Sequence, residues 1–440
     1  MRFQASEMKT MLVVTALIAL LGAGCIDSVV SDPSAPPDGA PWSVDESNAP
    51  GRVPSAVDDD AEAGEGGDSA ADASADDGGG SVTANETGSA VGVAAACEAT
   101  DGVPIGTDDN AADVMRSREP GTAYMVEAGV HSGNFDVEPR SGDTFCGEPG
   151  AVLDGAGRLE SAFSGEATNV TLDSLTVQNY DDGWQGGAIS PDPRAAGWVV
   201  RNVTATNNHW AGLLAADGMK ILGGSYIENG QLGIGGNAAT GILLDGLDDD
   251  PATYDGPELA RNKRLRVECG WEGGGMKWDR GSVTIRNAHV HDNACKGLWA
   301  DINARDALIE HNLIENNGQE GILYEISQDA VIRNNEINEN SLEDVSSWYW
   351  SGGITVASSF NVQIYDNRLS GNFNGITGTQ QDRFDSTPPA HLLDHLDVRD
   401  NLICASVGPH PTGVAADNGA DLDERDIIFA NNTIRDGTCD

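Results

Sequence analysis

The sequence predicts an all-β solenoid, a single-stranded right-handed parallel β-helix with a short N-terminal cap helix. Three observations predict this fold. A spaced pattern (aliphatic, two residues, asparagine, one residue, aliphatic) recurs five times between residues 309 and 434. A second pattern places an asparagine four residues before a glycine, and turn glycines recur at spacings of 22, 24, 32 and 22 residues. Repeats of this length indicate stacked units.

A unit of some 22 residues holds short strands and cannot bury its apolar face alone, so the units are expected to stack around one interior. Like residues would then superpose at about 4.8 Å, and the asparagines could form ladders that satisfy turn backbone. Horseshoes and propellers are the competing repeat folds, but the chain lacks a leucine consensus, a helical half-repeat and a roughly 40-residue period. The first pattern comprises Ile309, Asn312, Ile314; Ile332, Asn335, Ile337; Ile364, Asn367, Leu369; Val398, Asn401, Ile403; and Phe429, Asn432, Ile434. The second comprises Asn208 and Gly212, Asn229 and Gly233, Asn293 and Gly297, and Asn317 and Gly321, and the turn glycines are Gly275, Gly297, Gly321, Gly353 and Gly375.

The cap helix is expected within residues 107–118, with Thr107 or Asp108 as its N-cap. Pro120 and Gly121 end it, and a strand-like TAYMVEAGV segment follows. Its buried side would be formed by Ala111, Val114 and Met115.

Residues 1–25 are predicted to be an export signal, because positive charge precedes a short apolar run and small residues follow. The run, residues 10–21, is too short to span a bilayer. Residues 22–25 (Gly-Ala-Gly-Cys) resemble a bacterial lipobox, which implies lipidation of Cys25, although Gly22 stands where an aliphatic residue is usual. Ordinary signal-peptide cleavage is the alternative. The chain is therefore expected at the cell envelope or outer surface, lipid-anchored to the membrane, or otherwise secreted.

Residues 26–95 are rich in Ala, Asp, Gly, Ser and Pro and contain one base, Arg52. Such a segment cannot bury enough apolar surface to offset its ordering entropy, so a disordered acidic tether is predicted there. The β-helix domain is expected to fill residues 96–440. The chain carries 70 acids and 25 bases, a formal net charge of -45. Nucleic acid is an unsuitable partner for this charge.

Removing Cys25 leaves six cysteines, an even set that suggests disulfides in an oxidising compartment. Pairing of nearest neighbours would brace the start, the middle and the end of the repeat region. Free buried thiols are the alternative. The six are Cys97, Cys146, Cys269, Cys295, Cys404 and Cys439.

Over roughly residues 100–440 the chain resembles the pectate-lyase-like family of right-handed parallel β-helix proteins. The segments GLWADIN (297–303) and GILYEIS (321–327) look like a motif of exported bacterial β-helix proteins that mostly lack an assigned activity. The resemblance implies the fold and the cap helix, but no particular reaction. The sequence lacks the signature motifs of polygalacturonases, pectate lyases and alginate epimerases. Glu272 and Lys277 are only faintly similar to the acid-then-lysine arrangement of chondroitinase and alginate lyases.

Aligning the units on their turn glycines places Asp279, Asp301 and Glu325 at one position of three adjacent rungs. Lys277 and Trp299 lie two residues earlier, so strand alternation points all five side chains outward. Met276, Leu298 and Ile322 should point inward.

Three stacked carboxylates must raise a pKa, recruit a base or bind a cation. Calcium held by Asp279, Asp301 and Glu325 could bind a uronate, with Lys277 or Arg280 as the base of a lyase. Alternatively, Asp279 and Glu325, two rungs and about 9 Å apart, could hydrolyse a glycosidic bond. The candidate catalytic residues are Lys277, Asp279, Asp301, Glu325 and Arg280.

Nine bases fall between residues 261 and 305 and suggest a patch for an anionic glycan, with salt bridging to nearby acids as the alternative. Aromatic residues near this window could stack on sugar rings or pack against the wall of the β-helix. The histidines of the region show no metal spacing and suit surface or ladder positions. The bases are Arg261, Lys263, Arg264, Arg266, Lys277, Arg280, Arg286, Lys296 and Arg305. The candidate substrate-binding aromatics are Trp271, Trp278, Trp299, Tyr324, Trp348 and Trp350.

The leading prediction is an exported, surface-tethered polysaccharide-active protein, a lyase or glycoside hydrolase acting on an acidic glycan. The alternative is a non-catalytic envelope protein that binds glycans or mediates adhesion. Turnover of a glycan distinguishes the two.

Overall fold

The computed structural model describes residues 102–183, 185–247, 253–263, 265, 269–270, 272–343, 348–382, 391–417, 420–422 and 426–439. These residues all lie in one compact unit, Thr87–Asp440. The predicted export signal with Cys25, the tether over residues 26–95 and Cys97 lie outside the described residues and stay predictions. Within the described part of the chain, no helix has the length and hydropathy needed to cross a membrane.

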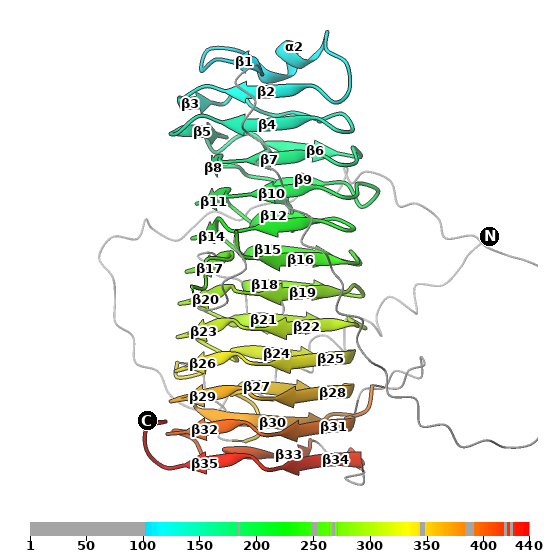
Figure 1. Ribbon diagram of the computed structural model, residues 1–440, viewed down its shortest axis with the longest axis vertical. Helices are drawn as coiled ribbons and strands as arrows, with labels where there is room; N and C mark the ends of the chain where they lie inside the picture. Colours follow the sequence, from blue (N-terminus) through cyan, green and yellow to red (C-terminus); the bar gives the residue numbers. More distant parts are fainter. Residues whose placement is uncertain are drawn as a thin grey trace, which may run out of the picture. The chain divides into compact units, whose positions relative to one another are not determined.

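The described chain winds through three parallel sheets, here named A, B and C, and visits them in turn on successive rungs (Figure 1). Sheet A has 13 strands: β1 (Val103–Ile105), β2 (Ala123–Val126), β4 (Thr144–Gly147), β7 (Thr171–Asp173), β10 (Val199–Arg201), β13 (Lys220–Leu222), β16 (Ile242–Asp245), β19 (Val283–Arg286), β22 (Ala307–Glu310), β25 (Gln328–Arg333), β28 (Phe360–Tyr365), β31 (Asp394–Arg399) and β34 (Ile427–Ala430).

Sheet B has 12 strands: β3 (Gly129–Ser132), β5 (Ala151–Asp154), β8 (Thr176–Gln178), β11 (Thr204–Thr206), β14 (Ser225–Ile227), β17 (Glu258–Ala260), β20 (His289–His291), β23 (Leu313–Glu315), β26 (Glu336–Asn338), β29 (Arg368–Ser370), β32 (Leu402–Cys404) and β35 (Thr433–Arg435). Sheet C has 10 strands: β6 (Phe163–Gly165), β9 (Gly187–Pro191), β12 (Ala211–Ala215), β15 (Leu232–Asn237), β18 (Gly274–Asp279), β21 (Lys296–Asp301), β24 (Ile322–Glu325), β27 (Gly352–Ala357), β30 (Asn374–Gln380) and β33 (Thr412–Ala416). This arrangement confirms the predicted parallel β-helix.

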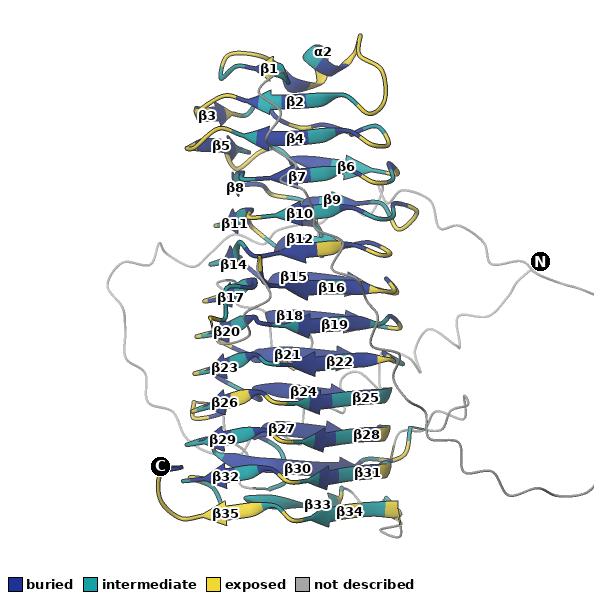
Figure 2. Cartoon of the chain, viewed as in Figure 1, coloured by how far each residue is buried: buried dark blue, intermediate teal, exposed yellow. Residues whose placement is uncertain are grey.

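The interior is a continuous stack of apolar side chains that every rung shares. Met276, Leu298 and Ile322 superpose in sheet C and are at most 1% exposed, as predicted. Most strands are dark blue in Figure 2, whereas the exposed residues gather at the turns. Stacking therefore supplies the burial that a single rung cannot provide.

Two asparagine ladders run along the solenoid and confirm the prediction. In the first, each side-chain amide from Asn312 to Asn401 donates to the next asparagine at 2.9–3.0 Å, ending at Asn432. The second ladder runs from Asn208 to Asn372. It also contains Asn262, Asn340 and Asn372, which the asparagine-glycine spacing missed. Insertions separate the first two from their turn glycines, and Asn372 lies three residues before Gly375.

The predicted turn glycines lie within strands of sheet C and not in turns, except Gly321, which directly precedes β24, and they stack closely enough to exclude a side chain. A Cβ on Gly297 would lie 2.6 Å from the carbonyl oxygen of Gly321 and 2.9 Å from the amide nitrogen of Asn317. Neither neighbour can move without disturbing the strand or the ladder. The recurrence of glycine at this position therefore follows from the close approach of adjacent rungs.

The cap helix α2 (Ala111–Met115) is shorter than predicted and has Asn110 as its N-cap, not Thr107 or Asp108. The Asn110 side chain accepts the backbone N–H of Asp113 at 3.1 Å. The preceding residues form a turn instead, in which the carboxylate of Asp109 accepts the N–H of Gly106 at 2.8 Å. Ala111 and Met115 bury against the first rungs, as expected for a cap.

Two disulfides confirm nearest-neighbour pairing in the middle and at the end of the repeat region, Cys269–Cys295 and Cys404–Cys439. Cys146 is also disulfide-bonded. Its predicted partner, Cys97, lies outside the described residues. The Cys269–Cys295 bond ties the segment that precedes β18 to the start of β21.

Candidate functional site

A groove of about 1130 Å³ lies on the outer face of sheet C. Its floor follows the outward positions of β6, β9, β12 and β15, which carry Ser164, Ser190, Leu214 and Gly235. Five strands from β6 to β18 span about 19 Å at the parallel-strand spacing. Three of these four floor residues are small, and the floor forms a trough across the strands.

At β18 the outward position is Lys277, which pairs in register with Gly235 on one side and Trp299 on the other. Lys277 is 7% exposed and Trp299 3% exposed. The groove therefore ends where these two large side chains fill the outer face. Three ionisable side chains line that end: Glu272, Lys277 and Asp279.

Lys277 is held between two carboxylates and an aromatic ring. Its ammonium nitrogen lies 3.0 Å from Glu272 Oε1, 2.9 Å from Asp301 Oδ2 and 3.9 Å from the centre of the Trp299 ring. Burial by itself lowers the pKa of Lys277, but Asp301 and Glu272 outweigh burial and raise that pKa. The protonated form is therefore favoured, which argues against the predicted role of Lys277 as a lyase base.

Glu272 belongs to the segment between β17 and β18 and faces the groove. Burial raises the pKa of its carboxyl group, the Lys277 ammonium lowers it, and the nearby charges of Asp301 and Asp279 raise it, with a raised pKa as the result. The Cys269–Cys295 disulfide lies three residues before Glu272 and fixes this segment to β21. A partly buried carboxyl group that keeps its proton to higher pH is suited to general acid chemistry.

Asp279 is the second carboxylate at the closed end of the groove. It accepts the backbone N–H of Ala238 at 3.2 Å and pairs with the Arg280 guanidinium at 2.7 Å. Arg280 has a positive φ of 52° and a half-exposed side chain. Asp279 and Glu272 are thus two carboxyl groups that line the same end of the groove.

The three predicted acids do stack, but they do not form one carboxylate cluster. Asp279 pairs in register with Asp301, and Glu325 continues the column and pairs with Ala357. Asp301 gives one oxygen to Lys277 and the other to the N–H of Ile302. Glu325 is not among the described lining residues of the groove. The predicted pairing of Asp279 with Glu325 as acid and base stays a prediction.

The predicted calcium binding by Asp279, Asp301 and Glu325 stays a prediction, and the first two carboxylates pair with Arg280 and Lys277. Among the described residues, a closely gathered set of candidate metal ligands lies elsewhere, at Asp394, His395 and Asp426. Recruitment of a base was one of the outcomes expected for stacked acids. Two of the three acids, Asp279 and Asp301, do recruit a basic side chain.

The predicted sugar-binding aromatics mostly serve packing. Trp278 and Tyr324 alternate with the outward residues and lie in the interior, at most 1% exposed, so they cannot offer a ring face to a sugar. Trp299 is buried on the outer face in a cluster with Leu323, Ala357 and the half-buried Trp350. Trp348 is half-buried in the same segment as Trp350, and Trp271 lies outside the described residues. For the buried rings, packing against the wall is the correct alternative.

The predicted basic patch is wrong, because 45 residues make about two turns of the solenoid and distribute their side chains over all three faces. Arg261, next to sheet B, pairs with Glu228 and Glu258. Arg286 lies on sheet A and pairs with Asp245 at 2.6 Å. Lys277 and Arg280, at sheet C, pair with acids as described above, and Arg264 and Arg266 lie outside the described residues.

The groove is lined by more acids than bases, although Arg194 pairs with Glu166 and Asp192, and Arg280 pairs with Asp279. Its described lining residues include six acids and two bases: Glu138, Glu166, Asp192, Asp217, Glu272 and Asp279 against Arg140 and Lys277.

Sequence reasoning missed Glu272 as a site residue, as well as the whole floor of the groove. Glu272 lies in a segment without repeat register, and the hints of a contact were its five-residue distance from Lys277 and the faint similarity of the two to an acid-then-lysine arrangement. The floor could have been found by extending the outward column backward from Lys277 to Gly235, Leu214 and Ser190. The signal is that three of the four residues in that column, Ser164, Ser190 and Gly235, are small.

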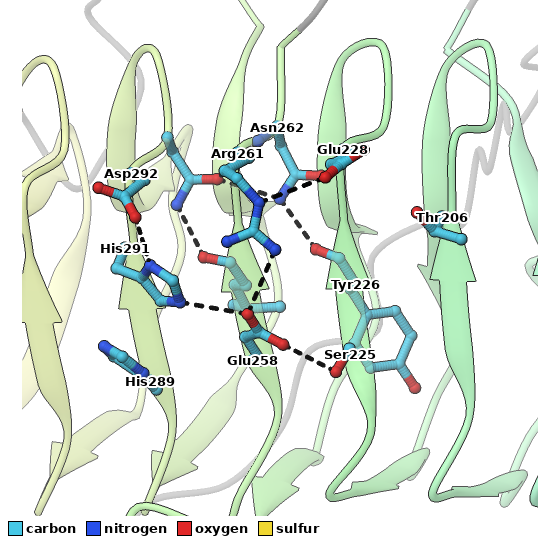
Figure 3. Close-up of polar contacts among 12 residues, drawn as sticks. Thr206, Ser225, Tyr226, Glu228, Glu258, Arg261, Asn262, His289, His291 and Asp292 are labelled. Carbon is cyan, nitrogen blue, oxygen red and sulfur yellow. Dashed lines mark hydrogen bonds and ion pairs between the residues drawn. The ribbon is translucent and has the colours of Figure 1, made fainter.

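A second polar cluster lies on sheet B, away from the groove (Figure 3). Glu258 accepts the hydroxyl of Ser225 at 2.9 Å and contacts His291 at 3.3 Å, and His291 also contacts Asp292 at 2.8 Å. His289 stacks on His291 with ring centres 3.9 Å apart and reaches Glu315 on the next rung. These histidines are ladder residues that link three rungs, in agreement with the sequence.

Glu258→Gln is expected to destabilise the fold in a pH-dependent way. The His291 hydrogen bond lowers the pKa of Glu258 from 4.5 to about 2, so its stabilisation is present above pH 4.5 and is lost as pH falls toward 2. Burial lowers the pKa of His291, but Glu258 and Asp292 outweigh burial and raise the pKa above 6.5, so its stabilisation is lost as pH rises through the folded-state value. Urea unfolding should show a loss of about 1 to 2 kcal/mol at pH 5.5 and less at pH 3 and pH 9.

The matched control is His209→Gln, which removes an exposed histidine 3.7 Å from Asp181. It should change stability by less than about 0.5 kcal/mol at each pH. An equal loss for Glu258→Gln at all three pH values would contradict the assignment.

The comparisons with known proteins concern the fold. A family model described as "Right handed beta helix region" matches residues 188–369. No curated protein sequence matches the chain significantly. The A-module of the Azotobacter vinelandii mannuronan C-5 epimerase AlgE6 aligns at 12% identity and a TM-score of 0.42, covering 74% of this chain and 92% of that module. PfbA, a surface adhesin of Streptococcus pneumoniae, aligns at 9% identity and a TM-score of 0.41, covering 77% and 91%.

Pectate lyase Pel9A aligns at 12% identity and a TM-score of 0.36, covering 63% of this chain and 76% of that chain. These likenesses are too distant to bear on chemistry. The matched region and the three stacked parallel sheets nevertheless agree on the architecture. The chain is a right-handed parallel β-helix protein.

Proposed function

We propose that this β-helix protein binds an uncharged polysaccharide in the sheet C groove and hydrolyses a glycosidic bond at the β18 end. The observation that supports the proposal most strongly is the placement of two carboxyl groups, Glu272 and Asp279, at that end. A hydrolase of this kind needs one carboxyl group that donates a proton and one that accepts a proton.

In the proposed reaction, Glu272 gives its proton to the glycosidic oxygen as the bond between that oxygen and the anomeric carbon breaks. Asp279 takes a proton from a water molecule whose oxygen bonds to the anomeric carbon. The products are a new reducing end and a free hydroxyl group. Lys277 and Asp301 act as positioning residues, since they set the charge around Glu272.

Two features favour hydrolysis of an uncharged glycan over the predicted lyase on an acidic one. A lyase base must be deprotonated, whereas the pKa of Lys277 is raised by Asp301 and Glu272 despite its burial. A uronate chain would also meet a groove with six acids.

The test is a panel of uncharged and acidic polysaccharides, assayed for new reducing ends and for unsaturated products. We expect reducing ends from an uncharged member without calcium. Asp301→Asn should move the basic limb of the pH–rate profile to lower pH. Loss of the negative charge of Asp301 lowers the pKa of Glu272. Lys277 would then pair with Glu272 alone, which lowers that pKa further.

A structural role of Asp301 would change the rate without moving that limb. Unsaturated products from an acidic glycan would favour the lyase instead. Binding without turnover in the whole panel would favour the non-catalytic alternative.

We also propose that the chain is exported and lipid-anchored at Cys25. The disulfides support export, because such bonds persist in oxidising compartments. Fatty-acid labelling that is unchanged in Cys25→Ser would contradict the lipid anchor.

A further inference from the structure

We propose that the groove is a blind trough that receives a glycan end-first, so that the protein acts on chain ends and not within the chain. The inference rests on the proposed function and specifies its mode of action. It follows from what covers the outer face of sheet C beyond β18.

The first observation is the change in exposure along the outward column. Ser164, Ser190 and Leu214 are partly exposed on the groove floor. Beyond Lys277 and Trp299, the same column continues with Leu323, which is 2% exposed. The column continues through fully buried threonines on β27 and β30 and ends at the partly buried Gly413 of β33. Trp299 and Leu323 are buried in a cluster with Trp350, so a segment from another part of the chain packs over this stretch of the outer face.

The second observation identifies that cover. The segment between β26 and β27 brings Trp350 onto a cluster of Trp299, Leu323 and Ala357. Asn374 fixes the segment from beneath, because its side-chain amide donates to the carbonyl oxygens of Trp348 at 2.8 Å and Trp350 at 2.7 Å. The cover is therefore anchored to the sheet, and the burial is not a property of one side chain.

A third anchor lies at the neighbouring aromatic residue. The Tyr349 ring stacks on His410 with ring centres 4.0 Å apart. His410 in turn donates its backbone N–H to the Asn374 side chain at 3.1 Å. The covering segment is thus connected to two later turns of the solenoid.

Between the open floor at β15 and the covered face beyond β21, the outer face is filled by packed and ion-paired side chains. The ammonium groups of Lys277 and Lys296 lie 3.9 and 4.4 Å from the centre of the Trp299 ring. Lys277 is also tied to Glu272 and Asp301, which come from two different segments. A linear chain lying in the groove cannot continue past this wall.

The proposed acid and base stand at the wall, so only a bond near a chain end can reach them. The groove extends from the wall over β15, β12, β9 and β6, where the rest of the chain would lie. Chain ends would enter, a short product would form at the wall, and the polymer would shorten stepwise.

The test uses the polysaccharide that the panel identifies, as a polymer and as its hexasaccharide. Viscosity and new reducing ends are followed together. We expect mono- or disaccharide release with little loss of viscosity per bond cleaved. Trp350→Ala should increase the viscosity loss per bond severalfold, because it thins the wall cover. Trp348→Ala, in the same segment but outside the Trp299 cluster, is the matched control.

The results separate this inference from the proposed function. Rapid loss of viscosity by the wild type, with long internal products, would overturn the end-first mode and leave the hydrolase intact. If the panel shows binding without cleavage, the hexasaccharide should bind more protein than the polymer at equal mass, and equal binding would overturn the inference. If Trp350→Ala unfolds, the wild-type viscosity result alone decides. No binding and no cleavage would end both proposals.

Discussion

Glu272→Gln is expected to lower turnover about a hundredfold or more while leaving glycan binding within about threefold, because a general acid typically contributes 10² to 10⁴ in rate. Glutamine keeps the shape of the side chain and can still accept a hydrogen bond from Lys277. It cannot deliver a proton to the leaving oxygen. The raised pKa of the Glu272 carboxyl group, caused first by burial, is the property that this change removes.

The measurement is kcat and the binding constant on the same polysaccharide, with Glu315→Gln as the control. Glu315 is also a partly buried glutamate with a basic neighbour, but it lies on sheet B beside His289. The control should keep wild-type kcat. A Glu272→Gln enzyme with wild-type kcat would exclude Glu272 as the acid, and equal losses in binding and kcat would indicate a structural role.

Asn335→Ala is expected to lower the free energy of unfolding by about 3 to 5 kcal/mol. Asn335 is 1% exposed, and its side chain accepts from the backbone and side-chain nitrogens of Asn312. It also donates to the carbonyl oxygen of Ile309 and to Asn367. Truncation leaves these buried groups unpaired, and each unpaired group costs about 1 to 3 kcal/mol.

Urea unfolding measures the loss, and hydrogen exchange locates it. Because each rung contacts mainly its neighbours, exchange should rise first in the rungs from β22 to β29. Asn338→Ala is the control, since this asparagine lies on β26 but points away from the interior and is partly exposed. It should cost less than about 0.5 kcal/mol. A similar loss for both variants would contradict the ladder's role.

The ladder and the groove also show which properties can be read from a single chain. Asn312, Asn335 and Asn367 recur because each rung repeats the same turn. The need for an asparagine at that turn can therefore be seen in the sequence of each repeat. The inward and outward alternation of Met276 and Lys277 is likewise local, since it follows from the pleat of a strand. Register, fold class and the direction of the five key side chains were therefore predictable.

The cover over the outer face was not predictable, because it comes from insertions that have no repeat. Trp299 points outward as expected but is buried beneath Trp350, which lies 51 residues later in the sequence. Glu272 became a site residue only through its contacts with Lys277. The basic residues seemed to form a patch in the sequence, yet the winding of the chain sends Arg261 and Arg286 to different faces.

By itself, the sequence determined the parallel β-helix, its interior, its asparagine ladders and the column containing Asp279 and Asp301. Each of these follows from a period that neighbouring rungs share. Only the tertiary structure decided which part of sheet C is open and where the groove ends. It also decided which carboxyl groups face that end, Glu272 and Asp279 instead of Asp279 and Glu325. The physical reason is that burial of an outward residue depends on the path of segments from other rungs, and no local pattern records that path.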